Sequence, residues 1–240
     1  QAWDKIPDTA KDADGAYYAD YTGIMSVGWN ADKYGDISSL DDLLDPKFAG
    51  TVALNGKPAE AGAAFNGYLM ANQLAGGDIN NLQPGLDYFK KLKEAGNLTT
   101  VDVTNGTIDS GQTGVVFDWT YNQASYKKEL KDKGVNWKYK TFPKAQVVSY
   151  YNQAINKDAP HPAAARLWEE YLYTADAQNL WFKGGANPVL LDSMKEDGTV
   201  DQATLKDAIT IEGEPVSYTN DDSTRITEWL QNNWDKTIGN

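Results

Sequence analysis

Tryptophan and tyrosine are the side chains of this sequence that are best suited to hold a ligand. The chain has 240 residues, of which 8 are Trp and 14 are Tyr, in a composition that is acidic and polar. Each of these side chains joins a flat apolar face to a polar tip, and a cation over the ring face is bound by about 0.5–2 kcal/mol. Most of them are expected in the core. Those at strand ends and at hinges are the candidates for ligand contacts.

The sequence lacks the residue patterns of the common catalytic chemistries. It has no Cys and one His, His161, which argues against disulfides, the usual zinc sites, thiol nucleophiles and a Ser-His-Asp hydrolase. Residues 12–15 begin like a calcium loop without its closing Glu, and Ser125-x-x-Lys128 lacks the companion motifs of penicillin-binding enzymes. Neither glycine-rich nucleotide-binding pattern occurs. The 34 acidic residues still allow many carboxylate pairs, so a carboxylate-based hydrolase remains the alternative to a binding protein.

The charge balance limits the partners of the chain. Asp and Glu number 34 against 22 Lys and Arg, which gives a net charge of −12 and a pI near 4.5. Because such a chain repels the phosphate backbone of nucleic acids and anionic lipid surfaces, neither nucleic acid nor an anionic membrane surface is an expected partner. No run of about 18 apolar residues occurs, so no transmembrane helix is expected. The start at Gln1, without a signal-like segment, indicates a processed or truncated protein.

Short apolar strands alternate with helices along the chain. The pattern predicts strands at 21–30, 51–54, 115–119, 135–141 and 147–155, and helices at 39–44, 60–74, 84–95, 121–131, 162–172, 174–182 and 222–238. This alternation is typical of an α/β fold with a largely parallel or mixed sheet that helices cover on both faces. Ligands of such sheets bind beyond the carboxyl ends of the strands. The turns after Leu54, Asp118 and Tyr151 are therefore the first candidate sites.

Several segments, taken in order, carry a resemblance to a known family. They are Tyr21–Gly23 and Gly28–Asn30, Leu40–Pro46 and Gly50–Leu54, Gly111–Tyr121, Tyr150–Ile155, Ala159–Ala165, and Gln178–Pro188. Together they resemble the solute-binding proteins of bacterial ABC importers, specifically the type II periplasmic-binding fold of the polyamine, ferric-iron, thiamine and aminophosphonate binders. The matching segments span nearly the whole chain.

The resemblance implies two α/β lobes that close on a solute about crossover strands. It assigns 1–22 to a linker and the first crossover, 23–150 to the second lobe, 151–195 to a returning segment of the first lobe, and 196–240 to a C-terminal segment that packs on the second lobe. Most of the first lobe has no counterpart in this sequence, so the resemblance implies a truncated chain.

The predicted helix at 162–172 carries an apolar stripe that would pack on the absent part of the first lobe. The stripe consists of Leu167, Trp168, Tyr171 and Leu172. Large apolar patches that stay exposed seek a partner. We therefore expect the chain either to self-associate through this face or to repack it.

The resemblance also indicates which residues bind the solute. They are Asn55 and Glu60 after the second strand, Asp118, Trp119 and Tyr121 after the buried strand, Tyr150, Tyr151 and Asn152 at the return hinge, and Tyr21 and Thr22 at the first crossover. A carboxylate among aromatic rings suits an organic cation, so a polyamine-like ligand is the first choice. The acids that polyamine binders carry after the second strand are, however, largely replaced here by residues 55–58.

Two other ligand classes remain open. Lys57 precedes a predicted helix N-terminus, a setting that suits a phosphonate or another anion. Ferric iron is the third choice, because the iron binders use adjacent tyrosines after the buried strand, where this chain has Thr120-Tyr121. Tyr150 and Tyr151 are adjacent, but strand alternation should send their side chains to opposite faces.

The function that the resemblance implies is capture of a small solute for delivery to an ABC permease. The protein would be periplasmic or extracellular, held at the membrane by the permease or by an anchor outside this chain. It would be no enzyme and would need no cofactor or metal. An enzyme on the same fold and an interaction domain are the alternatives from other classes, since a fold alone does not fix a function.

Overall fold

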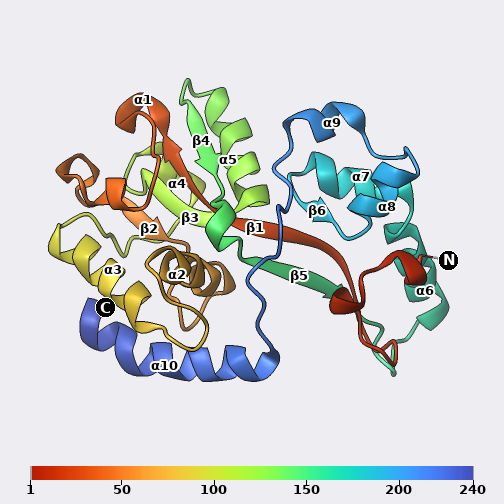
Figure 1. Cartoon of the computed structure of the whole chain (residues 1–240). Helices are drawn as coiled ribbons and strands as arrows, with labels where there is room; N and C mark the ends of the chain where they lie inside the picture. The colour runs from red at the N-terminus through yellow and green to blue at the C-terminus, as the bar shows by residue number, and fades with distance from the viewer. Residues whose placement is uncertain (1, 240) are drawn as a thin grey trace. The chain divides into compact units, whose positions relative to one another are not determined.

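The computed structural model describes residues 2–239, which form two compact units (Figure 1). Unit 1 consists of the described residues up to Ile24 together with Ser149–Ile211. Unit 2 consists of Met25–Val148 together with the described residues from Glu212 onward. The chain therefore crosses between the units after Ile24, after Val148 and after Ile211.

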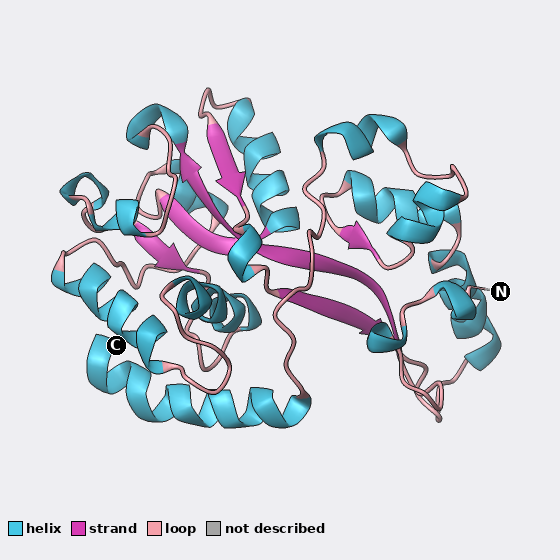
Figure 2. Ribbon diagram, in the orientation of Figure 1, coloured by secondary structure: helices cyan, strands magenta, loops and turns pink. Residues whose placement is uncertain are grey.

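Unit 2 holds a mixed sheet with helices on both faces (Figure 2). Its strand order is β2–β3–β1–β4, where β1 is Tyr18–Asn30, β2 Val52–Leu54, β3 Val115–Trp119 and β4 Trp137–Lys140. Strands β2 and β3 are parallel, whereas β3 and β4 both run antiparallel to β1. The α-helices of this unit are α1 Ala31–Tyr34, α2 Gly62–Leu74, α3 Gln83–Glu94, α4 Asn105–Asp109, α5 Thr120–Lys131 and α10 Asn220–Ile238, and its 3-10 turns are Asp41–Leu44, Pro46–Phe48 and Pro143–Ala145.

The side chains of β3 alternate between two layers of helices. The odd-numbered residues from Val115 to Trp119 belong to a large hydrophobic cluster that also contains side chains of α2, α3 and α10. Val116 belongs to a second cluster, together with Leu130 of α5. Because successive side chains of a strand point to opposite faces, Asp118 lies on the α5 face with Val116. The predicted α/β fold, with a mixed sheet and helices on both faces, is confirmed.

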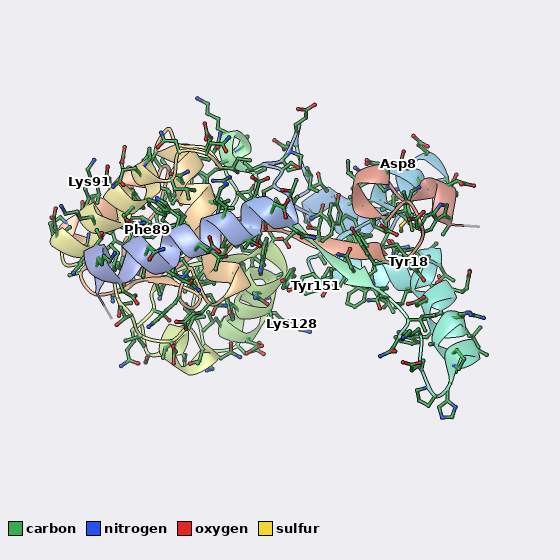
Figure 3. The ribbon with its side chains drawn as sticks, turned by 90° about the horizontal axis from the view of Figure 1, so that it is seen from below. Asp8, Tyr18, Phe89, Lys91, Lys128 and Tyr151 are labelled. Carbon is green, nitrogen blue, oxygen red and sulfur yellow. The ribbon has the colours of Figure 1, made fainter. Side chains whose placement is uncertain are left out.

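Helix α10 completes the large cluster of unit 2. Thr219 caps the helix through reciprocal hydrogen bonds with Asp222. Of the apolar side chains at helical spacing along α10, Ile226, Leu230, Trp234 and Ile238 are buried in the cluster, and Trp229 packs against it partly buried. Figure 3 labels Phe89 of α3, which packs against this helix with its ring centroid 5.3 Å from that of Trp234.

Glycine at position 28 lets α5 approach the sheet. A Cβ on Gly28 would lie 1.9 Å from Oε1 of Gln123, far inside any permitted contact. The Gln123 side chain needs this space, because its Oε1 accepts a hydrogen bond from Nε1 of Trp137 at 2.8 Å and its Nε2 donates to the carbonyl of Val116 at 3.0 Å. This buried amide thus connects α5 to two strands.

Unit 1 is built around the first part of β1. Strand β5, Val148–Gln153, pairs with β1, and β6, Asn187–Pro188, pairs antiparallel with it through Tyr21 and Thr22. Its α-helices are α6 Pro162–Leu172, α7 Ala175–Lys183, α8 Leu191–Glu196 and α9 Gln202–Asp207, and its 3-10 turns are Trp3–Lys5 and Asp8–Ala10. A separate hydrophobic cluster holds this unit together: Ile6, Ala10, Ala19, Phe182, Val189, Leu190, Leu191, Met194 and Val200.

Two of the predicted segment assignments need correction. Residues 1–22, expected to be a linker and crossover, pack into unit 1 where they are described, because Ile6 and Ala10 are buried in its cluster. The segment 196–240 was expected to pack as a whole on the second lobe. The structure instead divides it after Ile211, since Val200 is buried in the unit 1 cluster. The apolar residues near Val200 are few and form no stripe. The sequence therefore does not indicate which hydrophobic core they join.

The helix predicted at 39–44 is a 3-10 turn. The carboxylate of Asp42 accepts hydrogen bonds from the backbone N–H groups of Ser38 and Ser39, at 2.6 and 3.0 Å, and these bonds hold the turn. They also lower the pKa of Asp42. The Asp42 carboxylate thus holds the backbone just before the turn, while the turn itself has no side-chain N-cap bond.

The apolar stripe of α6 is not repacked in this structure. Leu172 is buried, but Leu167 is 73% exposed, Trp168 58% and Tyr171 43%. Of the two outcomes expected for this face, repacking is therefore wrong for three of its four residues. No helix in the described part of the chain is long and apolar enough to cross a membrane.

Candidate functional site

Asp118 lies at the carboxyl end of the only described strand that pairs with both β1 and β2. Strands β2 and β3 are parallel, so Asn55, which follows β2, and Asp118 and Trp119, which end β3, lie at the same edge of the unit 2 sheet. The hydroxyl of Ser26 on β1 donates to the carbonyl oxygen of Asp118 at 2.6 Å, which fixes the end of β3. Two neighbouring strands thereby bring three of the predicted site residues together.

The carboxylate of Asp118 is fully buried and accepts four hydrogen bonds. Its Oδ1 accepts from the N–H of Trp119 at 2.8 Å and from Nδ2 of Asn122 at 2.9 Å. Its Oδ2 accepts from Nδ2 of Asn55 at 2.8 Å and from the hydroxyl of Tyr126 at 2.9 Å. Burial raises the pKa of Asp118, and the four hydrogen bonds partly offset that rise. The carboxylate therefore organises its neighbours and has little capacity left for a ligand.

Asn55 and Asn122 are oriented by this carboxylate. Each donates one N–H of its amide to Asp118, and each is partly exposed. The Oδ1 atom of each amide takes no part in its bond to Asp118. An oriented amide with an available carbonyl oxygen and a second N–H can both accept from and donate to a hydroxyl group.

Trp119 and Tyr121 differ in their access to solvent. Trp119 is 5% exposed and belongs to the core of unit 2, whereas Tyr121 is partly buried and packs against that core. Their rings are stacked, with centroids 6.3 Å apart and planes 16° apart. Trp119 is thus first a core residue, whereas the resemblance implies a solute contact at this position.

Glu60 does not join the Asp118 cluster. It is exposed on the turn before α2, where its carboxylate lies 4.0 Å from the ammonium group of Lys57. An exposed pair at that distance contributes little to stability. Of the two acids expected at the site, only Asp118 takes part in an ordered network.

In unit 1, Tyr21, Tyr151 and Trp181 form an aromatic stack. The Tyr21 ring lies 4.8 Å from that of Tyr151 at 11° and 4.3 Å from that of Trp181 at 26°. Because two rings this close cannot share one face of Tyr21, they must cover opposite faces. Burial raises the pKa of Tyr21 to about 12, with smaller contributions from Tyr151 and Asp20.

The other predicted residues of unit 1 have separate surroundings. Thr22 is buried and its hydroxyl donates to the carbonyl of Ser149 at 2.8 Å. Tyr150 packs against the hydrophobic cluster of unit 1, Tyr151 is 44% exposed, and Asn152 is exposed. The two adjacent tyrosines thus have different environments, as strand alternation predicts, and they do not form a paired ligand set for iron.

Asp20 is a buried carboxylate of unit 1. It is fully buried on β1, and it accepts hydrogen bonds from the N–H of Tyr21 at 2.8 Å and from Nε2 of Gln153 at 2.7 Å. Burial raises the pKa of Asp20. The pair joins β1 to β5 within this unit.

Asp20→Asn is expected to change the pH dependence of stability. The pKa of Asp20 in the folded state is higher than its ordinary value. At a pH above this pKa, the buried negative charge destabilises the wild type. As the pH falls and the carboxyl group becomes protonated, this destabilisation is lost. The stability of Asp20→Asn relative to the wild type should therefore be highest at neutral pH and should decrease on acidification. Urea unfolding at pH 7 and at pH 5 measures this difference. The exposed Asp132→Asn serves as the control, and an advantage of Asp20→Asn that grows on acidification would contradict the assignment.

The sequence reasoning missed Asn122, Tyr126 and Trp181. The first two lie four and eight residues after Asp118, on one face of the helix that follows β3, so their spacing was a usable signal. Trp181 has no such signal, because it is 160 residues from Tyr21, which it stacks on. Among the described residues, no group of three or more His, Asp or Glu side chains is arranged to hold a metal ion.

A family model for bacterial extracellular solute-binding proteins matches residues 1–208. Since this match covers most of the chain, the protein belongs to that family of solute-binding proteins. A comparison with curated protein sequences finds no significant match.

Solved structures with the same fold are periplasmic binding proteins. AfuA from Actinobacillus pleuropneumoniae, with fructose 6-phosphate bound, is 19% identical with a TM-score of 0.69, and the match covers 98% of this chain and 73% of AfuA. The spermidine/putrescine substrate-binding protein PotD from Streptococcus pneumoniae is 13% identical with a TM-score of 0.69, covering 99% and 76%. Iron-bound HitA from Pseudomonas aeruginosa is 19% identical with a TM-score of 0.66, covering 96% and 73%. These similarities establish the type II periplasmic-binding fold.

Proposed function

We propose that this chain is the solute-capturing component of a bacterial ABC importer, and that it delivers its solute to a membrane permease without catalysing a reaction. Membership of the solute-binding family and the fold support this role. The site in unit 2 supports it as well, because its polar groups are side chains suited to hydrogen bonding and none of them forms a recognisable catalytic arrangement. The protein would act in the periplasm or outside the cell.

For the solute, we propose a hydroxyl-bearing organic molecule in preference to a polyamine. The observation that carries this choice is the saturation of Asp118 by four donors, which leaves its carboxylate little capacity to bind an ammonium group. The same four bonds orient the amides of Asn55 and Asn122, and an oriented amide pairs well with a hydroxyl group. Fructose 6-phosphate, which is bound in the AfuA structure, is the first compound to test.

A panel of solutes tests the proposal. Thermal unfolding is measured with fructose 6-phosphate, free sugars, spermidine, an aminophosphonate, thiamine and ferric iron, because a ligand that binds only the folded state raises the unfolding temperature. We expect a shift with a sugar or sugar phosphate, without any conversion of the compound. A shift with spermidine alone would overturn the choice of solute, and turnover of a bound compound would overturn the non-catalytic role.

Asn55→Ala is the variant that tests the amide. Loss of one hydrogen bond to the solute should weaken binding about tenfold in isothermal titration calorimetry. Asn232→Ala is the matched control, since that exposed amide donates only to the carbonyl of Glu228, at 2.8 Å in α10. Equal affinities of the two variants would contradict a solute contact at Asn55.

We further propose that the exposed stripe of α6 mediates self-association. Leu167, Trp168 and Tyr171 present apolar surface on one side of this helix. Light scattering after size-exclusion chromatography should show an oligomer that Trp168→Glu converts to a monomer. A monomeric wild type would contradict this proposal.

A further inference from the structure

A groove on unit 2 lies apart from the Asp118 cluster. Its volume is about 530 Å³, which is ample for a small organic ligand, and every residue that lines it belongs to unit 2. The groove lies at the C-terminal end of α2, which supplies Ala71, Leu74 and Ala75 to the lining. Asn55 precedes the other end of this helix, which has 13 residues. Since a helix of that length spans about 20 Å, the groove is separate from the amides that Asp118 orients.

The walls of the groove are tied to one another. The hydroxyl of Tyr88 on α3 donates to the carbonyl of Leu40 at 2.9 Å, which joins α3 to the 3-10 turn that follows α1. The ammonium group of Lys140 donates to the carbonyl of Ser38 at 2.9 Å and lies 5.1 Å from the centroid of the Phe142 ring. These contacts fix three parts of the lining, so an occupant meets a groove that is already formed.

The most buried part of the lining is apolar. Leu40, Tyr88 and Phe142 are each no more than 7% exposed, and they belong to the large hydrophobic cluster of unit 2. Leu74, also in the lining, is partly buried and packs against the same cluster. A large apolar group that enters the groove is therefore removed from water against these side chains, and this removal favours binding.

Charged side chains of both signs line the exposed part of the groove. Asp41 is exposed at the start of the 3-10 turn, and Asp87 and Lys91 are exposed on α3. Asp41 lies near the hydroxyl of Tyr88, because its charge is, after burial, a cause of the raised pKa of that tyrosine. Asp87 accepts a hydrogen bond from Nε2 of Gln83 at 2.8 Å. The groove thus offers two negative groups and one positive group beside an apolar interior.

Lys91, which Figure 3 labels on α3, is not neutralised by its own helix. Asp87 precedes it by four residues, a spacing at which opposite charges on a helix commonly pair. Within residues 2–239 no salt bridge joins these two, whereas Lys90 and Glu94, at the same spacing on α3, lie 3.8 Å apart. The ammonium group of Lys91 is therefore available to an anionic group in the groove.

We propose that this groove is a second binding site of the protein, and that it takes a free amino acid with a large apolar side chain. The ammonium group of the ligand binds between Asp41 and Asp87, and its carboxylate binds Lys91. Its side chain packs on Leu40 and Phe142. A simple cation would be repelled by the lysine and a simple anion by the two carboxylates, whereas a zwitterion satisfies both signs of charge. This inference does not depend on the proposed solute, because the two sites share no residue.

Four probes test the requirements for charge and for apolar surface. L-Phenylalanine has all the required groups, N-acetyl-phenylalanine lacks the ammonium charge, phenylalaninamide lacks the carboxylate, and L-alanine lacks the ring. A titration followed by nuclear magnetic resonance should give phenylalanine a dissociation constant of about 0.1–1 mM, as suits a small ligand in an open groove. Alanine should bind at least about tenfold more weakly. Equal affinities of these two amino acids, or no binding of phenylalanine at about 10 mM, would overturn the inference.

Two variants at exposed positions locate the charges. Asp41→Asn should weaken the binding of phenylalanine about threefold to tenfold and leave that of N-acetyl-phenylalanine unchanged, because this probe has no charge that loses its partner. Lys91→Gln should weaken phenylalanine to a similar extent and leave phenylalaninamide unchanged. Lys90→Gln is the matched control on the same helix, outside the groove, and it should bind every probe as the wild type does.

The outcomes for these variants decide the proposal. Equal losses for phenylalanine and for the probe that lacks the matching charge would show that neither side chain contacts the ligand, and would overturn the inference. An effect of Lys90→Gln as large as that of Lys91→Gln would overturn it as well. Since neither result bears on Asn55→Ala, failure of this inference leaves the proposed function intact.

Discussion

Asp118→Ala is expected to lower the free energy of unfolding by about 3–5 kcal/mol. The substitution removes the acceptor of four hydrogen bonds, and their donors lie on three elements: Asn55 after β2, the backbone of Trp119, and Asn122 and Tyr126 of α5. It also leaves space in a fully buried position. Chemical denaturation of the two proteins measures the loss.

Asp118→Asn separates the charge of this side chain from its shape. An amide has one acceptor atom, so two of the four donors lose their partner, and about half of the loss is expected. The control is the substitution Asp132→Ala at an exposed position. Its free energy of unfolding should stay within about 0.5 kcal/mol of the wild-type value. A loss that small for Asp118→Ala would show that the network contributes little.

Trp119→Ala is expected to destabilise the protein by about 3–5 kcal/mol, the range for large aromatic residues in a core. The residue is 5% exposed, and it belongs to the same hydrophobic cluster as Phe117 and Met25. A ligand contact at the end of a strand would have predicted a small effect on the stability of the unliganded protein. The measured quantity is again the free energy of unfolding, without ligand.

Leu180→Ala is the control for this experiment. Both substitutions truncate a large apolar side chain, but Leu180 is 62% exposed on α7, so its removal should change the free energy of unfolding by less than about 1 kcal/mol. A loss below 1 kcal/mol for Trp119→Ala would show that this indole is replaceable in the core. The first assignment of Trp119, as a ligand contact, would then regain support.

Local patterns in the sequence were sufficient to predict the framework of unit 2. The run Val115–Trp119 forms β3 with the predicted bounds, because five buried residues before a helix leave few other conformations. The helix predicted at 174–182 is α7, which Thr174 caps by accepting a hydrogen bond from the N–H of Ala177. The stripe of α10 is buried because its spacing follows the helical period. Where neighbours in sequence are neighbours in space, the pattern determined the structure.

The candidate site was predictable only where its residues follow one strand. Asp118 was identified from its position at a strand end, and the same reasoning could have reached Asn122 and Tyr126 through the helical spacing. That the carboxylate is saturated could not be predicted, because saturation depends on Asn55, which lies 63 residues away. The stack of Tyr21 with Trp181 was likewise out of reach, since no local pattern reports contacts between distant segments.

The place of α10 in unit 2 has a consequence for how the protein is made. The four core side chains that α10 supplies are synthesised after all of unit 1, whereas Tyr68 and Phe89, whose rings Trp234 contacts, are translated much earlier. A nascent chain paused before residue 220 would therefore expose that aromatic surface, which is a state prone to aggregation and to chaperone binding. Unit 1, whose segments end at Ile211, can close its own core before that point. The order of translation thus makes unit 2 the last to become protected, although most of its sequence comes first.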